Sequence, residues 1–172
     1  MSRPSDWKDR ELGRDLKHSY IVQAPAGSGK TELLTQRLLT LLAKVESPEE
    51  VVAITFTRKA AAEMGLRLVS HLHAALRQQK GLNENETLEP HEQVSRDLAL
   101  SVLENDAAQG WNLLEQPGRL RVRTIDSLCS ELARQLPVLS GLGGGQQLIE
   151  ASLLLYLSST QLHDIFFASL LL

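Results

Sequence analysis

The stretch Ser19–Leu34, SYIVQAPAGSGKTELL, decides the fold that is expected of this 172-residue chain. Its first part, Ser19–Ala24, is a short apolar run, which predicts a buried β-strand. The run ends at a turn rich in proline, glycine and serine, and Lys30–Lys44 then shows leucines at helical spacing. The sequence therefore predicts a strand, a loop and a helix in succession.

The loop between this strand and this helix has the pattern of a phosphate-binding loop, G-x-x-x-x-G-K-[ST], with alanine in place of the first glycine. Its later glycines allow a tight turn and a close approach of the backbone N–H groups to phosphate oxygens, and the dipole of the following helix favours an anion. Lys30 can bridge the β- and γ-phosphates of ATP as the catalytic lysine, and the Thr31 hydroxyl can ligate Mg²⁺. The expected phosphate-binding residues are Ala24, Pro25, Ala26, Gly27, Ser28, Gly29, Lys30 and Thr31.

This loop does not name a function by itself, because kinases, GTPases, transporters and helicases share it. A glycine-rich turn with an incidental lysine is the alternative interpretation. The predicted strand before the loop and the predicted amphipathic helix after it favour nucleotide binding.

A second strand–loop–helix unit and further elements follow along the chain. Repeated alternation of strands and helices predicts an α/β fold, a parallel sheet with flanking helices. The predicted elements are a strand at Val51–Thr55, a helix at Arg58–Gln79, a loop at Lys80–Pro90, a helix at His91–Ala108, a strand at Arg119–Thr124 and a helix at Asp126–Leu136 with Asp126 near its N-cap.

Composition indicates one globular domain, with 42% hydrophobic and 23% charged residues. The single cysteine excludes an internal disulfide, and no Cys/His cluster has metal-ligand spacing. The first residues lack the apolar segment of a secretory signal, which favours a cytoplasmic location. His71 and His73 are expected on a solvated helix face, and Trp111 is expected as a packing anchor.

Charge is unevenly distributed along the chain. Residues 1–80 hold 13 Lys/Arg against 9 Asp/Glu, whereas residues 81–172 hold 5 against 12. A polyanion site is therefore expected in the first half. The strand Arg119–Thr124 places three arginines on one face, which could meet DNA phosphates or pair with acids; ion pairing is the more common outcome for exposed charges.

The segment Thr55–Met64, TFTRKAAAEM, combines hydroxyls, an aromatic ring and two cations where a strand meets a helix. Such a junction can hold a backbone phosphate while Phe56 offers a stacking face to a base. The alternative is that Phe56 is part of the core and that Arg58 and Lys59 are solvated helix charges. Composition alone favours this alternative.

The loop QAPAGSGKTELL and the segment VVAITFTRKAAAEM resemble motifs I and Ia of superfamily 1 helicases of the UvrD/Rep/RecB type. Val122–Cys129 is similar to motif Ib, and Leu136–Gly141 resembles the segment that follows it in RecB/AddA-like helicase-nucleases. The resemblance implies a P-loop NTPase (RecA-like) fold, an incomplete lobe 1A with the start of a helical insertion. It places an N-terminal part of the ATP-binding domain at 1–145.

The same resemblance implies an ATP-dependent DNA helicase that translocates on single-stranded DNA and unwinds duplex DNA in repair or recombination. ATP and Mg²⁺ are the implied cofactors, and the implied partners are DNA and a helicase-nuclease partner subunit. The residues implied to contact single-stranded DNA are Thr55, Phe56, Thr57, Arg58 and Thr124.

The chain departs from the pattern of these helicases in three places. Asp126 stands where many members have histidine, and no L-x-x-x-Q motif for adenine precedes the predicted first strand. No D-E-x-Q-D sequence supplies the acidic pair that holds Mg²⁺ and activates water. The alternative function is a truncated, catalytically inactive nucleotide-binding module, and a small kinase is a weaker third hypothesis.

Residues 146–172 are apolar and contain no Lys or Arg. They predict either the start of a helical subdomain or out-of-frame sequence. Charged residues in a membrane span cost about 3 kcal/mol each, and Asp164 lies in the middle of the most apolar run. No membrane association is therefore expected.

Overall fold

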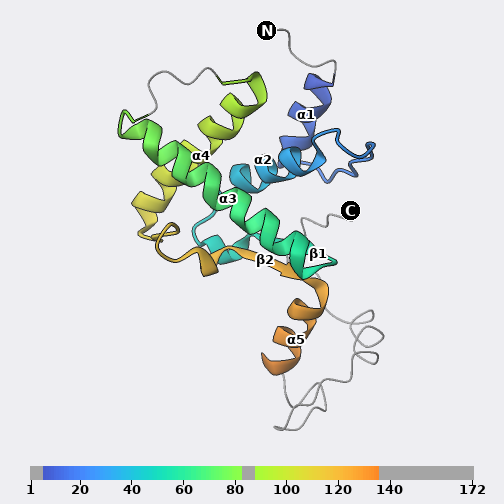
Figure 1. The fold of residues 1–172 in the computed structure, drawn as a ribbon. Helices are drawn as coiled ribbons and strands as arrows, with labels where there is room; N and C mark the ends of the chain where they lie inside the picture. Colours follow the sequence, from blue (N-terminus) through green and yellow to red (C-terminus); the bar gives the residue numbers. More distant parts are fainter. Residues whose placement is uncertain (1–5, 83–87, 136–172) are drawn as a thin grey trace.

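The computed structural model describes residues 6–82 and 88–135 as a mixed α/β fold, with two parallel strands beside a layer of helices (Figure 1). The elements are, in chain order, α1 (Trp7–Arg14), α2 (Lys30–Leu42), the 3-10 helix η1 (Pro48–Glu50), β1 (Val52–Thr55), α3 (Arg58–Gln79), α4 (Pro90–Gln109), the 3-10 helix η2 (Pro117–Arg119), β2 (Arg121–Thr124) and α5 (Ile125–Gln135). The predicted helices after the loop and after the second strand are confirmed, as is the strand before α3.

Strands β1 and β2 pair in parallel, with Val52 opposite Arg121 and Thr55 opposite Thr124. The chain between them forms α3 and α4, because parallel neighbours need a long crossover connection. Both strands end at the same edge of the sheet, so the residues that follow Thr55 and Thr124 lie at that edge.

Helices α2, α3 and α4 pack against one another and enclose the core. Helix α3 also contacts both strands, so it joins the helical layer to the sheet. The side chains that form this core are mainly aliphatic, as helical spacing of Leu, Val, Ala and Met predicts. The core members include Leu34, Leu38, Leu39, Leu42, Met64, Leu68, Leu72, Ala99, Val102 and Leu113.

The connection between α2 and β1 is fixed by side chains in and just after α4. Trp111 is buried, and its Nε1 donates to the carbonyl of Glu46 at 3.0 Å. Asn105 Nδ2 donates to the carbonyls of Leu42 at 3.0 Å and Val45 at 2.9 Å. The prediction that Trp111 is a packing anchor is confirmed, and its indole N–H has the partner that a buried tryptophan needs.

Helix α1 is fixed to α2 by hydrogen bonds from arginine side chains and by a close packing contact. Arg37 of α2 donates to the carbonyls of Gly13 and Asp15, both at 2.8 Å, and of His18 at 3.0 Å. These carbonyls lie at or beyond the end of α1, where a helix leaves acceptors without partners. Gly13 is buried against Leu33, and a Cβ at Gly13 would lie 3.2 Å from a Leu33 methyl.

The predicted strand at Ser19–Ala24 is wrong, since residues 19–25 are in neither strand of the sheet that the structure describes. Ile21 is 98% exposed, although it belongs to the apolar run. A strand needs a hydrogen-bonded neighbour, and the described fold pairs β1 with β2 rather than with this segment. The apolar pattern shows that a segment can be a strand, but not which strand it pairs with.

The last predicted strand and helix differ from the structure in their first residues. Strand β2 begins at Arg121, because Pro117 starts a 3-10 turn that includes Arg119. Thr124 rather than Asp126 caps α5, since Thr124 Oγ1 accepts from the Ser127 N–H at 3.2 Å.

Helix α5 projects away from the helical layer beyond the end of β2 (Figure 1). The domain boundary predicted at residue 145 and the tail 146–172 lie outside the described residues. Among the residues that the structure describes, no helix is both long and apolar enough to cross a bilayer.

Candidate nucleotide site and nucleic-acid interface

The loop that precedes α2 has the backbone conformation of a tight, glycine-dependent turn. Gly27 and Gly29 have φ angles of 78° and 80°, the left-handed region that glycine enters without steric cost. Helix α2 begins at Lys30, and its first bond joins the Leu33 N–H to the Gly29 carbonyl at 3.1 Å. The loop thus leads directly into a helix N-terminus, where free N–H groups and the dipole favour an anion.

The side chain of Lys30 folds back over this loop. Its Nζ donates to the carbonyls of Ala24 and of Pro25, the latter at 3.1 Å. Both acceptors belong to the predicted phosphate-binding residues, so the lysine lies across the loop that it is expected to serve. Thr31, the expected Mg²⁺ ligand, is half-buried in the first turn of α2.

One buried polar atom in the loop has no hydrogen-bond partner. Ser28 Oγ is the only such side-chain atom in the described part of the chain. A buried hydroxyl without a partner costs free energy, and a hydrogen bond from the hydroxyl to a phosphate oxygen would recover it. The loop thus combines positive-φ glycines, a lysine side chain and a hydroxyl without a partner.

Arg10 of α1 also contacts this loop, and the sequence did not predict it as a site residue. Its Nη2 donates to the Ser28 carbonyl at 2.7 Å, and its Nε donates to Asp6 Oδ2 at 2.9 Å. The bond from Arg10 lowers the pKa of the Asp6 carboxyl below its ordinary value. The i,i+4 spacing of Asp6 and Arg10 predicts their ion pair on a helix, but not the contact with the loop.

A polar cluster lies directly behind the loop, around Glu32 of α2. The carboxylate accepts from the Ser95 hydroxyl of α4 and lies 3.6 Å from His71 Nε2 and 3.7 Å from Arg67 Nη1, both of α3. Burial alone would raise the pKa of Glu32, but the nearby His71 side chain, the hydrogen bond from Ser95 and the charge of Arg67 lower it to about 2. The cluster ties the first turn of α2 to α3 and α4.

The expectation that His71 and His73 both lie on a solvated helix face is therefore wrong for His71. His71 faces Glu32 across the α2–α3 interface, whereas His73 is exposed. Positions two apart on a helix point in different directions, so one contacts α2 and the other meets solvent. In the described ranges, no group of three or more His, Cys, Asp or Glu side chains could hold a metal ion.

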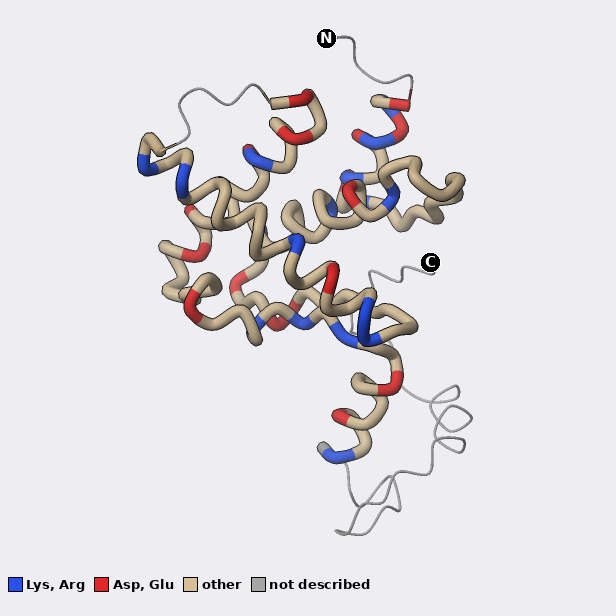
Figure 2. Tube along the Cα trace, viewed as in Figure 1, with Lys and Arg blue, Asp and Glu red and all other residues tan. Residues whose placement is uncertain are grey.

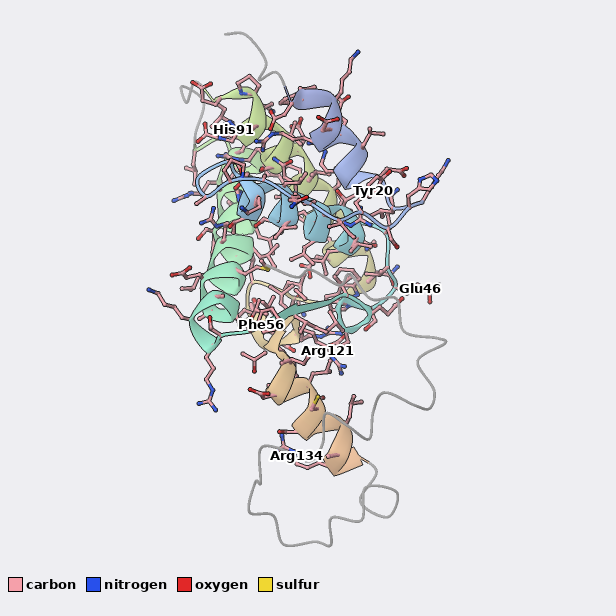
Figure 3. The ribbon with its side chains drawn as sticks, turned by 90° about the vertical axis from the view of Figure 1, so that its right-hand side faces the viewer. Tyr20, Glu46, Phe56, His91, Arg121 and Arg134 are labelled. Atoms are coloured by element: carbon pink, nitrogen blue, oxygen red, sulfur yellow. The ribbon has the colours of Figure 1, made fainter. Side chains whose placement is uncertain are left out.

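A second candidate surface lies where β1 ends and α3 begins. Phe56 is 59% exposed, and Thr57, Arg58 and Lys59 beside it are exposed as well. The interpretation of Phe56 as a core residue is therefore wrong. Figure 3 labels Phe56 at the start of α3, and Figure 2 shows Lys and Arg gathered where α3 begins and along β2.

The two threonines predicted to contact DNA lie beneath this surface. Thr55 is 5% exposed and Thr124 is 7% exposed, and the two are opposite each other at the ends of β1 and β2. The Thr55 hydroxyl donates to the Thr57 carbonyl at 3.0 Å, whereas the Thr124 hydroxyl caps α5. Thr57 in turn caps α3, because its Oγ1 accepts from the Ala60 N–H at 3.1 Å. The threonines shape the junction, and Phe56 and Arg58 are presented to solvent.

Two of the three arginines near β2 form ion pairs. Arg119 pairs with Glu49, with Nε–Oε1 at 2.6 Å and Nη2–Oε2 at 3.0 Å, and Arg123 pairs with Glu131. Ion pairing is therefore confirmed for these two residues, although Glu49 belongs to the basic first half of the chain. Arg121, labelled in Figure 3, starts β2 and forms none of the salt bridges found among the described residues.

The chain is similar to DNA helicases over most of its length. It is 33% identical over 141 residues to an ATP-dependent helicase/nuclease subunit of Desulfitobacterium hafniense, and the match covers 78% of this chain and 8% of that protein. It is 38% identical over 111 residues to the ATP-dependent DNA helicase UvrD2 of Mycobacterium tuberculosis, and this match covers 64% of this chain and 16% of that protein.

A third relative is the ATP-dependent DNA helicase PcrA of Staphylococcus epidermidis, 48% identical over 63 residues, which are 36% of this chain and 8% of that protein. The chain thus spans less than a fifth of the length of these relatives. No solved structure is significantly similar to it.

The family model of the UvrD/REP helicase N-terminal domain matches residues 8–165. Since this match spans most of the chain, the protein belongs to the UvrD/REP helicase N-terminal domain family.

Proposed function

We propose that the chain is the ATP-binding part of an ATP-dependent DNA helicase. The observation that carries the proposal is the loop, with Gly27 and Gly29 in the left-handed region directly before α2 and Lys30 lying across it. Family membership supports the same function. The proposal includes a RecA-like lobe for this chain. It also includes translocation of the helicase along single-stranded DNA and a role in repair or recombination.

In the proposed site the loop holds the phosphates of ATP. Backbone N–H groups around Gly27–Thr31 donate to phosphate oxygens, and Lys30 turns from its carbonyl acceptors toward the β- and γ-phosphates. Thr31 ligates Mg²⁺ through its hydroxyl. The bound Mg²⁺ supplies charge neutralisation for the phosphates, while the residues of this chain orient the nucleotide.

The proposed contact with single-stranded DNA lies at the start of α3. Phe56 stacks on a base, and Thr57 and Arg58 contact backbone phosphate beside the N-terminus of α3. Thr55 and Thr124 support this surface from the strand ends. The relatives carry the names of helicases and, in one case, of a helicase/nuclease subunit, which supports DNA and a helicase-nuclease partner subunit as partners of this chain.

Nucleotide binding is tested by titrating the purified chain with ATP and Mg²⁺ in a calorimeter. Lys30→Ala removes the charge at the loop, and we expect it to weaken binding at least about tenfold, since hydrogen bonds to charged groups contribute about 1.5–3 kcal/mol. Lys44→Ala is the matched control, because Lys44 lies just beyond the other end of α2. Equal affinity for ATP in the wild type and in Lys30→Ala contradicts the proposed site.

DNA binding is tested by fluorescence anisotropy with a labelled single-stranded oligonucleotide at several salt concentrations. Phe56→Ala should weaken binding by about 1–3 kcal/mol at an unchanged salt dependence, because it removes stacking. Arg58→Ala should reduce the salt slope by about one, because it removes a phosphate contact. Lys80→Ala at the far end of α3 should leave the affinity unchanged. If Lys80→Ala weakens DNA binding and Phe56→Ala and Arg58→Ala do not, the contact with DNA lies elsewhere.

The second candidate is a nucleotide-binding module without turnover. The observation that favours it is that the sequence contains no D-E-x-Q-D acidic pair to hold Mg²⁺ and activate water. We therefore expect the 172-residue chain to show no DNA-stimulated ATP hydrolysis in a phosphate-release assay. Hydrolysis that rises with single-stranded DNA and disappears in Lys30→Ala would overturn this expectation.

A further inference from the structure

Arg10 reaches the phosphate-binding loop from a different helix. It lies in α1, 18 residues before Ser28, and its Nη2 donates to the Ser28 carbonyl at 2.7 Å. Its side chain is 18% exposed. The guanidinium also lies against Gly29, since a Cβ at Gly29 would be 3.1 Å from Nη1 and 3.3 Å from Nη2. The two residues that flank one peptide bond of the loop therefore both contact Arg10.

The contact fixes the direction of that peptide bond. No cis peptide occurs in the described residues, so the bond between Ser28 and Gly29 is trans. In a trans peptide the carbonyl and the N–H point in opposite directions. An arginine that holds the Ser28 carbonyl on one side of the loop therefore turns the Gly29 N–H toward the other side.

Arg10 is itself held in place. Asp6 Oδ2 accepts from its Nε at 2.9 Å and lies 2.8 Å from its Nη2. Helix α1 is fixed to α2 by the contact of Gly13 with Leu33 and by the bonds of Arg37 to the end of α1. A guanidinium held in this way loses little conformational entropy when it contacts the loop, which favours a positioning role over an incidental surface contact.

We propose that Arg10 is a positioning residue of the nucleotide site. It holds the Ser28 carbonyl so that the Gly29 N–H donates to a phosphate oxygen. Through this contact α1 becomes a structural part of the nucleotide site. The inference rests on the proposed function, because it concerns the same loop. The ligand group that Arg10 serves is the phosphate chain and not the base.

The test compares binding of ATP and of inorganic tripolyphosphate to the wild type, Arg10→Ala, Arg10→Lys and Lys8→Ala. Arg10→Ala should weaken binding of both ligands by the same factor, about tenfold, because the bond it removes comes from a charged donor. Arg10→Lys should retain part of the affinity, since one ammonium cannot hold both Asp6 and the loop in the same planar geometry. Lys8→Ala is the control, because Lys8 is exposed on the same helix.

A second measurement follows the Gly29 amide directly by ¹H–¹⁵N NMR. In the wild type, tripolyphosphate should shift the Gly29 amide proton downfield, and Arg10→Ala should reduce that shift while the far-UV circular dichroism stays unchanged. If Arg10→Ala fails to fold, Asp6→Asn provides the same comparison, since it releases the guanidinium but keeps it present; we expect an intermediate affinity.

Three outcomes would overturn the inference. Unchanged affinity in a folded Arg10→Ala, with binding lost in Lys30→Ala, would show that the loop binds phosphate without Arg10. Loss of ATP affinity with unchanged tripolyphosphate affinity would assign Arg10 to the nucleoside. A wild-type chain that binds neither ATP nor tripolyphosphate would contradict the proposed function and the inference together. This third outcome differs from the first two because Lys30→Ala then has no binding to remove.

Discussion

At the scale of single residues, two features of its surroundings favour glycine at position 29. Its φ of 80° lies in the left-handed region, and a Cβ built there would lie 3.1 Å from Arg10 Nη1, a tight contact with the guanidinium. A non-glycine residue in this conformation costs about 1–2 kcal/mol. Gly27 has a similar φ of 78°, but no atom lies within 4 Å of a Cβ built there.

We expect Gly29→Ala to lower the ATP affinity more than Gly27→Ala does, since only the first displaces Arg10 in addition to straining the loop. Calorimetric titration of both variants measures the difference. Gly65→Ala is the control, because Gly65 lies within α3 with open space around it; it should raise the free energy of unfolding by about 0.5–1 kcal/mol and leave ATP binding unchanged. Equal losses at Gly27 and Gly29 would show that strain alone matters.

At the scale of elements, the ion pair between Glu49 and Arg119 connects the turns that precede the two strands. Glu49 lies in η1 before β1, and Arg119 lies in η2 before β2. The bond from Arg119, assisted by the Ser47 hydroxyl, lowers the pKa of Glu49 from 4.5 to about 2. The ionised form is therefore favoured in the folded state.

A carboxyl group whose pKa is lower in the folded than in the unfolded state stabilises the fold. This stability is present above the pKa of the unfolded state and is lost as the pH falls through the pKa of the folded state. For Glu49 the window runs from pH 4.5 down to about 2. We expect Glu49→Gln to be less stable than the wild type at pH 7, and the difference to shrink as the pH is lowered through this window. Urea denaturation at a series of pH values measures it.

Glu63→Gln serves as the control for this series, since Glu63 is exposed on α3. Its free energy of unfolding should differ little from that of the wild type at every pH in the series. If the free energies of unfolding of Glu49→Gln and the wild type differ by a constant amount down to pH 3, the ion pair is not linked to folding.

At the scale of the whole molecule, α3 is the element on which the others depend. It contacts α2, α4 and both strands, and it starts at the proposed DNA surface. Its buried side chains Met64, Leu68 and Leu72 belong to the hydrophobic core that these elements share in the described part of the chain. Loss of packing in α3 should therefore affect the helical layer and the sheet together.

We expect Leu72→Ala to lower the free energy of unfolding by about 2–5 kcal/mol, because it leaves a cavity at a fully buried position. Leu66→Ala is the control: Leu66 lies on the same helix but is 68% exposed, and its change should stay within about 0.5 kcal/mol. Chemical denaturation followed by circular dichroism and by the fluorescence of the two tryptophans, Trp7 and Trp111, measures both variants. Separate transitions in the two signals would contradict one shared core.

Local sequence features predict the elements that depend on local interactions. The bounds of α3 are those predicted, because Thr57 caps it and Ala, Leu and Met fill its length. The conformation of the glycines in the loop before α2 is likewise local, since it is a property of single residues. The segment at Ser19–Ala24 failed as a predicted strand because pairing depends on another part of the chain.

By itself, the sequence determined the helix after the loop, the glycine conformations within it and the helicase family, because capping, periodicity and motif spacing are short-range properties. Only the tertiary structure decided that Arg10 contacts Ser28, that Glu32 meets Ser95 across two helices and that Phe56 is exposed. The first two contacts join residues far apart in the chain, and the packing of α1, α3 and α4 on α2 and of α3 on the strands decides all three features. No pattern within a single segment contains that packing.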